Sequence, residues 1–269
     1  MKIAHISDLH FGMHLPAVLD AFIESIHKIE PEIVIISGDV TQRAKNYQFE
    51  LLCSFLGQVP GTILVVPGNH DVPFYNFWAR LIHPFKTYNN YIGKHFKTEF
   101  CNDEIAILGV NSVNPLKGIK GKLTNSVLDK INSFFVEKKK NSNILFFHHN
   151  FDHIEGLHKP LENESQFLSY LRQSNIDVVC TGHLHYANVG LIRKNTNRVC
   201  LVLHAGSLLC SRKKDNMNSY FSIDINAEQC SVDWHVFRNN QFEIHKNYTV
   251  NFADKEFKLK FEDEDSGAL

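Results

Sequence analysis

Five short clusters of residues that can bind metal ions follow one another along this chain of 269 residues. They are Asp8-Leu9-His10, Gly38-Asp39, Gly68-Asn69-His70-Asp71, His148-His149 and Gly182-His183-Leu184-His185. Each follows a run of mostly aliphatic residues that predicts a buried strand, at 2–7, 33–37, 63–66, 143–147 and 176–181. Because open α/β sheets bind ligands at the carboxyl ends of their strands, we expect all five clusters to meet in one crevice.

The side chains in these clusters predict a centre for two metal ions. The candidate ligands are Asp8, His10, Asp39, Asn69, His148, His183 and His185. Carboxylate, amide and imidazole donors without a cysteine suit divalent ions such as Mn, Fe or Zn. Seven donors exceed the need of one ion, since a catalytic zinc site typically has about three protein ligands and an open position. Two adjacent ions can clamp the attacking and leaving oxygens of a displacement at phosphorus.

The order of these motifs resembles that of the calcineurin-like metallophosphoesterase superfamily, over residues 1–237. The resemblance implies an α/β (α+β) fold, a four-layer αββα sandwich, with a binuclear site at the strand ends. By position it implies four ligands for the first ion, namely Asp8, His10, Asp39 and His185. For the second ion it implies Asp39, Asn69, His148 and His183, so that Asp39 bridges the two.

The resemblance also implies roles in catalysis and substrate binding. His70 would contact the scissile phosphate or protonate the leaving group, and Asp71 would orient His70 or cap its turn. Asn69 would help to neutralise the phosphate oxygens. His149 would lie behind the ligands or at the rim where the substrate binds. The other histidines are interpreted as ordinary surface or core residues, including His5, His14, His27, His83, His95, His158, His235 and His245.

Arg43, four residues after Asp39, is a further candidate for substrate binding. In the Ser/Thr-phosphatase branch of the superfamily, an arginine at this offset grips the phosphate, and a guanidinium matches phosphate oxygens in a bidentate manner. However, Gln42 stands where that branch carries an Asp that orients the catalytic His. This departure argues against a protein phosphatase, and Arg43 could instead be an exposed residue at the start of a helix.

Further segments are similar to those of small bacterial phosphoesterases and of class III cyclic-nucleotide and glycerophosphodiester phosphodiesterases. These segments are Thr41-Gln42-Arg43-Ala44, Pro67 to Pro73, Ala205-Gly206-Ser207, Arg212 and Asn218-Ser219-Tyr220. The similarity implies hydrolysis of a small-molecule phosphodiester, or phosphomonoester, by in-line attack of a metal-bridging hydroxide. Arg212 could point toward this site or belong to an exposed turn.

Three other functions stay open at this point. A nuclease of the superfamily would normally add a capping domain and a basic face, whereas the net charge here is −1. A pyrophosphate hydrolase acting on lipid A shares the site, but the sequence has no membrane-binding stretch. A non-catalytic scaffold would be expected to lose ligands or His70, and all are present.

The composition predicts a cytoplasmic enzyme with one domain. At 43% hydrophobic residues, the chain can bury one substantial core over residues 1–250. No apolar run reaches the roughly 18 residues of a membrane span. The first strand is expected to start at residue 2 without a signal peptide, and the six cysteines lack C-x-x-C spacing. We therefore expect reduced, mostly buried thiols. The partner is expected to be a small molecule. The acidic tail at 251–269 is expected to be disordered. A homo-oligomer is left open.

Apolar spacing predicts the remaining elements. Helices are expected at 15–29, 47–56 and 124–140, the last with Thr124 as N-cap, and a hairpin at 95–100 and 104–111. Strands at 199–204, 219–225, 231–237 and 242–248 would form the second sheet of the sandwich. In the aromatic stretch 72–93, Phe74, Tyr75 and Trp78 could pack against the sheet or stack on the organic part of a substrate.

Overall fold

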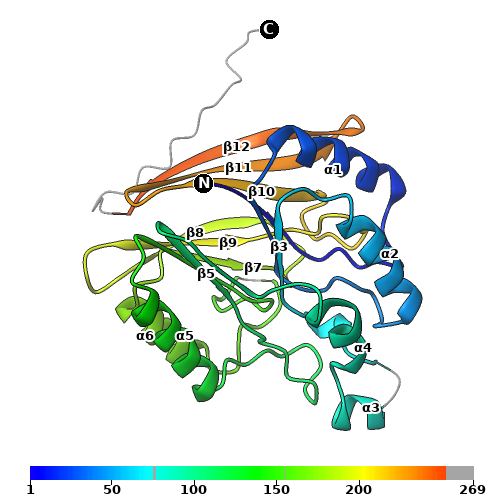
Figure 1. The fold of residues 1–269 in the computed structure, drawn as a ribbon, viewed down its shortest axis with the longest axis horizontal. Coiled ribbons are helices and arrows are strands. Elements are labelled where there is room, and N and C mark those ends of the chain that lie inside the picture. Colours follow the sequence, from blue (N-terminus) through cyan, green and yellow to red (C-terminus); the bar gives the residue numbers. More distant parts are fainter. Residues whose placement is uncertain (75–76, 155, 253–269) are drawn as a thin grey trace, which may run out of the picture.

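Two six-stranded sheets stack face to face and carry helices on their outer sides (Figure 1). The computed structural model describes residues 1–74, 77–154 and 156–252. The first sheet has the strand order β12-β11-β10-β1-β2-β3, and the second has the order β4-β5-β6-β7-β9-β8. Together with the helices these sheets form the predicted four-layer αββα sandwich.

The first sheet begins with three parallel strands joined by two helices. The strands are β1 (Lys2–Ile6), β2 (Ile33–Ile36) and β3 (Thr62–Val65), and the helices are α1 (Pro16–Ile29) and α2 (Asn46–Leu56). An antiparallel meander extends the sheet beyond β1. It consists of β10 (Ser219–Ile225), β11 (Gln229–Arg238) and β12 (Gln241–Asn251).

The second sheet has four parallel strands with an antiparallel strand at each edge. The parallel strands are β5 (Ile105–Gly109), β6 (Ser142–Phe146), β7 (Val178–Thr181) and β9 (Val199–His204). The edges are β4 (Glu99–Cys101) and β8 (Asn188–Arg193). The outer helices are α5 (Asn125–Lys138) and α6 (Glu164–Gln173). Thr124 caps α5 by accepting a hydrogen bond from the N–H of Val127, as predicted.

Between β3 and β4 the described residues form four short helical turns. They are η1 (Asn69–Asp71), α3 (Phe77–Ile82), α4 (Lys86–Tyr88) and the π-helical η2 (Asn89–Gly93). Pro73 and Pro84 stand outside these turns, because proline lacks the N–H that a helix interior needs.

The alternation of side chains along the central strands explains why their sequences are apolar throughout. In β2, Ile33 and Ile35 belong to the core between the sheets, whereas Val34 and Ile36 pack toward α1 and α2. Successive strand residues point to opposite faces, and both faces of this sheet are covered. A third cluster, including Leu145, packs the second sheet against α5 and α6.

Three features of the elements differ from the expectations. Only 199–204 joins the second sheet, while the strands at 219–225, 231–237 and 242–248 correspond to β10, β11 and β12 of the first sheet. Helix α6 was not predicted, because it buries only Phe167 and Leu171 and most of its residues are polar. The first strand of the hairpin is also shorter than expected, since β4 begins at Glu99.

The described residues show four of the six cysteines buried and no disulfide among them. Within the same residues, no helix combines the length and apolar character needed to cross a membrane. The single domain at 1–250 stays a prediction, supported by the core that the two sheets share. From residue 253 onward, the predicted acidic tail lies outside the described residues.

Candidate metal centre

The predicted ligands converge where strands of both sheets end. The loops after β1, β2 and β3 contribute Asp8, Asp39 and Asn69 from the first sheet. The loops after β6 and β7 contribute His148 and His183 from the second. The crevice therefore lies between two sheets rather than along one, and the order of motifs in the sequence does not reveal this.

The first predicted ligand set forms one compact, buried group. Its members are Asp8, His10, Asp39 and His185, whose ligand atoms all lie within 4.8 Å of one another. The Nε2 atoms of His10 and His185 are 3.3 Å apart. Asp8 Oδ1 lies 3.5 Å from His185 Nε2 and accepts no hydrogen bond within the described residues. A buried carboxylate oxygen aimed at two imidazoles fits a bound cation.

The second predicted set adjoins the first through Asp39. His148 Nε2 lies 3.4 Å from Asp39 Oδ2, 3.2 Å from Asn69 Oδ1 and 3.3 Å from His183 Nδ1. One nitrogen lone pair cannot satisfy all three neighbours by hydrogen bonding, whereas a shared cation can. These donors are carboxylate, amide and imidazole, which suit a divalent metal.

Hydrogen bonds to main-chain carbonyls fix which ring nitrogen of His148 and of His185 faces the centre. A carbonyl only accepts, so His148 Nδ1 donates to Ser37 O (2.8 Å) and its Nε2 is left with a lone pair. His185 Nδ1 donates in the same way to Arg212 O. The main-chain N–H of His183 donates to Asp8 Oδ2 (3.0 Å). Such partners of metal ligands set the tautomer and the ring orientation.

The backbone is strained at the same positions. Five of the seven candidate ligands have positive φ angles, namely Asp8 (53°), His10 (46°), Asp39 (50°), His183 (71°) and His185 (52°). Residues with a Cβ rarely adopt this conformation, and it costs free energy unless the surroundings impose it. Strained residues gather at functional sites, so their concentration here supports a binding centre.

The electrostatics of the centre favour added positive charge. Burial disfavours the carboxylate of Asp39, yet the imidazoles of His148 and His70 hold the pKa of Asp39 well below its usual range. Burial likewise disfavours the imidazolium of His148, but Asp39 raises the pKa of His148 to about 9. A proton on His148 occupies the place that a metal ion would take, since metal ligands must be deprotonated.

His70 and Asp71 follow the ligand Asn69 but have different surroundings. His70 Nδ1 donates to the carbonyl of Gln42 (3.0 Å), and its Nε2 lies 3.5 Å from Arg212 Nη1. The carboxylate of Asp71 accepts hydrogen bonds from the N–H groups of Val40, Thr41 and Gly68 and from the Thr41 hydroxyl, at 2.8–3.1 Å. Asp71 therefore ties the two loops together, and the structure favours turn capping over contact with His70.

His149 lies behind the ligands rather than at the rim. Its side chain is 2% exposed, and its Nδ1 is 2.8 Å from the hydroxyl of Ser112. Its ring centre is 4.6 Å from that of His183. Of the two positions expected for His149, the structure gives the one against a ligand, so substrate contact has no support from the geometry.

A cavity of about 500 Å³ opens above Asn69 and His70. Arg43 lines it, half-buried, with its guanidinium 4.4 Å from the centre of the Phe74 ring. Arg212 also lines it, although its side chain is exposed, so both arginines face the cavity while Arg212 also fits an exposed turn. Phe74 is 54% exposed and Trp78 is 68% exposed; Tyr75 lies outside the described residues.

Two residues near the site were not found from the sequence. Arg80 of α3 lines the same cavity, but it belongs to no motif and is placed only by the fold. The Cys210 thiol lies within 4.8 Å of nitrogens of His10 and His185, and burial raises its pKa. The only sequence signal for Cys210 was its position between Ser207 and Arg212, in a segment already matched to phosphoesterases.

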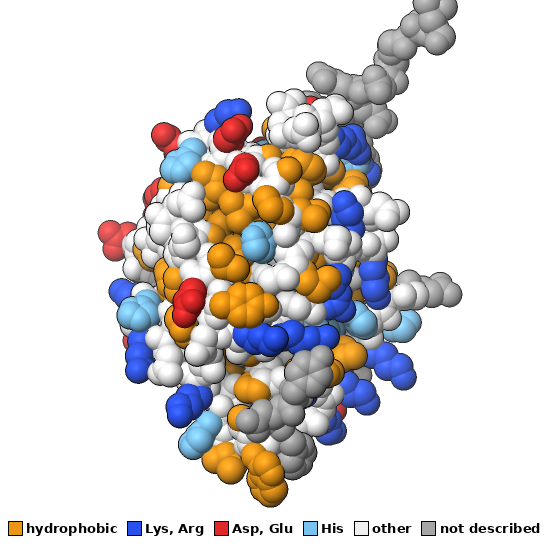
Figure 2. Space-filling view, turned by 90° about the vertical axis from the view of Figure 1, so that its right-hand side faces the viewer, with side chains coloured by type: hydrophobic (Ala, Val, Ile, Leu, Met, Phe, Trp, Pro, Cys, Tyr) orange, Lys and Arg blue, Asp and Glu red, His pale blue; other side chains and the backbone are white. Residues whose placement is uncertain are grey.

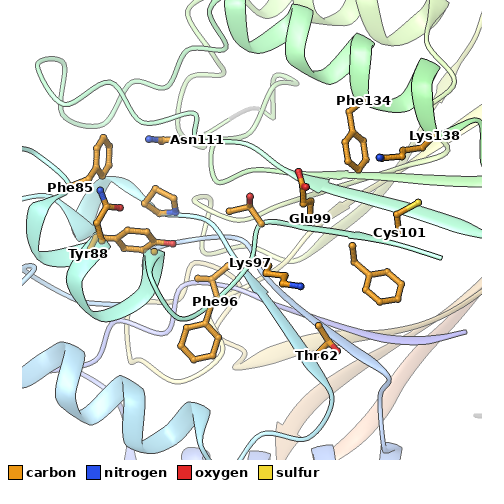
Figure 3. Close-up of a pocket in the computed structure, with 16 residues that line it drawn as sticks. Thr62, Phe85, Tyr88, Phe96, Lys97, Glu99, Cys101, Asn111, Phe134 and Lys138 are labelled. Atoms are coloured by element: carbon orange, nitrogen blue, oxygen red, sulfur yellow. The ribbon is translucent and has the colours of Figure 1, made fainter.

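A larger cavity of about 1010 Å³ lies along the edges of β3 and β4 (Figure 3). Phe85, Tyr88 and Asn111 lie at one end of it, and Phe134 and Lys138 lie at the other. None of the described residues that line it is a candidate metal ligand. Of these two cavities, the smaller one therefore adjoins the candidate ligands, through Asn69.

Comparison with known proteins gives a family match and two similar relatives. A family model described as calcineurin-like phosphoesterase matches residues 1–187. A probable cyclic nucleotide phosphodiesterase of Pseudoalteromonas sp. (strain SM9913) is 26% identical over 252 residues, covering 86% of this chain and 90% of the relative. Another, from Ruthia magnifica subsp. Calyptogena magnifica, is 24% identical over 189 residues, covering 68% of this chain and 75% of the relative.

The fold is also similar to that of a solved structure. Purple acid phosphatase from yellow lupin (Lupinus luteus) seeds superimposes with a TM-score of 0.69 at 11% identity, covering 93% of this chain. This chain spans 53% of the lupin protein, about half of its length. At this identity the likeness concerns the fold alone.

Proposed function

The chain belongs to the calcineurin-like phosphoesterase family, and we propose that, as a metal-dependent phosphoric ester hydrolase, it uses two divalent ions to cleave a small phosphodiester. The observation that carries the proposal is the position of Asp39 Oδ2. It lies 3.7 Å from His10 Nε2 of the first ligand set and 3.4 Å from His148 Nε2 of the second. One carboxylate oxygen thus faces both sets, as a bridging ligand would.

The donor sets named above would hold the two ions, with Asp8, His10 and His185 on one side of Asp39 and Asn69, His148 and His183 on the other. When bound, such ions lower the pKa of water and so supply a nucleophile near neutral pH. The identity of the ions as Mn, Fe or Zn stays a prediction. The donors are compatible with each of these metals.

The remaining groups suit the binding and protonation of a phosphoester. Asn69, Arg43 and Arg212 line the cavity together and would hold the phosphate oxygens. His70 Nδ1 donates its hydrogen bond to the Gln42 carbonyl, so Nε2 is the ring nitrogen available at the cavity. Nε2 would donate a proton or a hydrogen bond to the leaving-group oxygen. Asp71 would act by keeping the loops of Asp39 and His70 together.

A nucleotide phosphodiester is the substrate class that we propose. Both relatives are named probable cyclic nucleotide phosphodiesterases, and the cavity presents the exposed ring of Phe74 beside Arg43. An aromatic ring next to a guanidinium can hold a flat base beside a phosphate. Cleavage of nucleic acid or of a pyrophosphate bond is the alternative within the same family. A cytoplasmic location and assembly into a homo-oligomer stay predictions.

The direct test compares substrates on the Mn-loaded protein. We expect bis-p-nitrophenyl phosphate and cyclic mononucleotides to be hydrolysed with higher kcat/KM than p-nitrophenyl phosphate. Activity should disappear in EDTA and return with Mn, and His185→Ala should abolish it while the exposed His27→Ala on α1 should not. No hydrolysis of any of the three by protein that holds two ions would overturn the proposal, and a preference for p-nitrophenyl phosphate would overturn its diester part.

A further inference from the structure

The cavity above the metal centre is lined by three arginines that come from three separate segments. Arg43 follows Asp39, Arg80 lies on α3, and Arg212 follows β9. The same cavity reaches Asn69 and His70, so its contents can contact the reacting phosphate. None of the described residues that line it is acidic. Its walls thus carry three positive charges without a lining carboxylate to balance them.

The charges of Arg80 and Arg212 are not neutralised by the described part of the chain. Among the described residues, neither of them forms an ion pair with a carboxylate. Arg212 Nη1 lies 3.5 Å from His70 Nε2, so this guanidinium is at the reacting end of the cavity. Cationic groups placed together in a cleft raise the local concentration of anions.

Arg80 is fixed by a hydrogen bond to another loop of the protein. Its Nε–H donates to the carbonyl of Pro115, which joins α3 to the loop before α5. Its Nη2 atom also lies 3.7 Å from the place where a side chain would begin at Gly118. One edge of the guanidinium is therefore fixed by the protein. The remaining N–H groups form a preoriented fork, which lowers the cost of binding a phosphate.

The surroundings of Arg80 are basic over a long stretch of sequence. Residues 72–98 and 105–128 contain no Asp or Glu. In the lower part of Figure 2, Lys and Arg side chains are interspersed with hydrophobic ones. The lining also includes Met13, Phe74 and Ile119, which are 41–56% exposed. The cavity thus combines apolar surface with positive charge. One phosphodiester carries a single negative charge, which is too little to balance the charge of the lining arginines.

We propose that the substrate carries a second phosphate group, bound by Arg80, in addition to the scissile phosphodiester at His70 and Arg212. The inference rests on the proposed function and specifies its substrate as a nucleotide phosphodiester with an additional phosphate. The apolar residues then contact the base and the sugar. Arg43 stacks on Phe74, and both line the same cavity.

Two chromogenic nucleotides that differ only in the second phosphate test the inference. They are thymidine 5′-(p-nitrophenyl phosphate) and the same compound with a 3′-phosphate, both assayed with the Mn-loaded full-length protein. The scissile bond and the leaving group are identical, so the ratio of the two kcat/KM values reports recognition of the added phosphate. We expect a ratio of about 10 or more in favour of the 3′-phosphate, the size of one charge-assisted hydrogen-bonded contact.

Substitutions of Arg80 test whether this residue binds the second phosphate. Arg80→Gln should bring the ratio close to one, and Arg80→Lys should give an intermediate ratio, because an ammonium keeps the charge without the fork. Arg172→Gln, an exposed arginine on helix α6, is the matched control and should keep the wild-type ratio. Thermal unfolding of each variant checks that α3 and the Pro115 loop remain folded. Calorimetry with thymidine 3′,5′-bisphosphate and thymidine 5′-monophosphate should show the same preference without turnover.

The outcomes separate this inference from the proposed function. Failure to hydrolyse either nucleotide and bis-p-nitrophenyl phosphate would contradict the phosphodiesterase itself. Hydrolysis of both nucleotides with a wild-type ratio near one would overturn the second-phosphate site and leave the phosphodiesterase standing. A high ratio that persists in Arg80→Gln would overturn the assignment to Arg80. If Arg80→Gln does not fold, the wild-type ratio still tests the second-phosphate site, and the Arg80→Lys ratio still tests its assignment to Arg80.

Discussion

The main-chain N–H of His70 donates a hydrogen bond to Oδ1 of Asp39 at 2.8 Å. This bond occupies one carboxylate oxygen of Asp39 and leaves Oδ2 toward His10 and His148. The same contact places His70 relative to the centre, because its ring follows directly from the bonded amide. Asp39 thus connects the two proposed metal ions and the proposed proton donor through one side chain.

Removal of the His70 imidazole should slow the reaction in a way that depends on the leaving group. We expect His70→Ala to lose about 10²–10⁴-fold in kcat toward a cyclic nucleotide, whose alkoxide leaving group needs a proton. The loss toward bis-p-nitrophenyl phosphate should be smaller, since p-nitrophenolate leaves without one. Steady-state kinetics with metal content measured in parallel checks this. Equal losses for both substrates would indicate that His70 binds phosphate instead.

Arg43 should act through its shape as well as its charge. We expect Arg43→Ala to lower kcat/KM by about 10- to 100-fold without a change in metal content. Arg43→Lys should not restore activity, because an ammonium neither forms a bidentate contact nor stacks on Phe74 in the same manner. Arg193→Ala, at an exposed position of β8, is the control. Parental kinetics in both Arg43 variants would exclude a contact with the substrate.

Asn69 should affect one ion and not the other. Its Oδ1 contacts His148 Nε2 (3.2 Å), and His148 does not belong to the group around Asp8 and His10. We therefore expect Asn69→Ala to retain about one ion per chain after desalting, whereas the parent retains about two. Elemental analysis by mass spectrometry provides the count. Retention of both ions would show that the amide is not a ligand.

Stability should fall in mild acid because of a histidine far from the site. Burial lowers the pKa of His235, which stacks on Tyr220, to about 4. The unfolded chain takes up this proton near pH 6.5, so between about pH 6.5 and 4 it binds more protons than the folded chain. Stability is lost as pH falls through this window, by up to about 1.4 kcal/mol per pH unit.

Replacement of His235 should flatten this dependence. We expect the melting temperature of His235→Gln to change less than that of the parent between pH 7 and 4.5 in EDTA. The exposed His27→Gln should follow the parent. If His235→Gln shows the parental slope, the acid sensitivity arises at other groups.

The sequence predicted most of the metal centre because its ligands lie directly after strands. Asp8, Asp39 and His183 follow apolar runs whose ends are easy to locate, and the fold then has little freedom in placing them. The sequence did not reveal that β6 and β7 belong to a different sheet from β1. Strand pairing depends on contacts between distant segments, which local patterns do not contain.

Arg80, Cys210 and helix α6 were missed for related reasons. Arg80 lines the cavity, and its Nε–H donates to Pro115 O, 35 residues later in the chain. Cys210 comes close to His10 through a β-bridge between His14 and Cys210, which are distant in the sequence. Helix α6 buries two side chains, so its apolar spacing is too sparse to identify it. Each depends on tertiary contacts that override local sequence signals.

A crystal structure of the Mn-loaded protein with anomalous scattering data recorded at the Mn edge tests the central claim most directly. We expect two anomalous peaks about 3.5–4 Å apart. Asp39 Oδ2 should contact both peaks, and Asn69 and His148 should contact the second. A single peak at full occupancy, with Asn69 and His148 turned away from it, would contradict a binuclear centre.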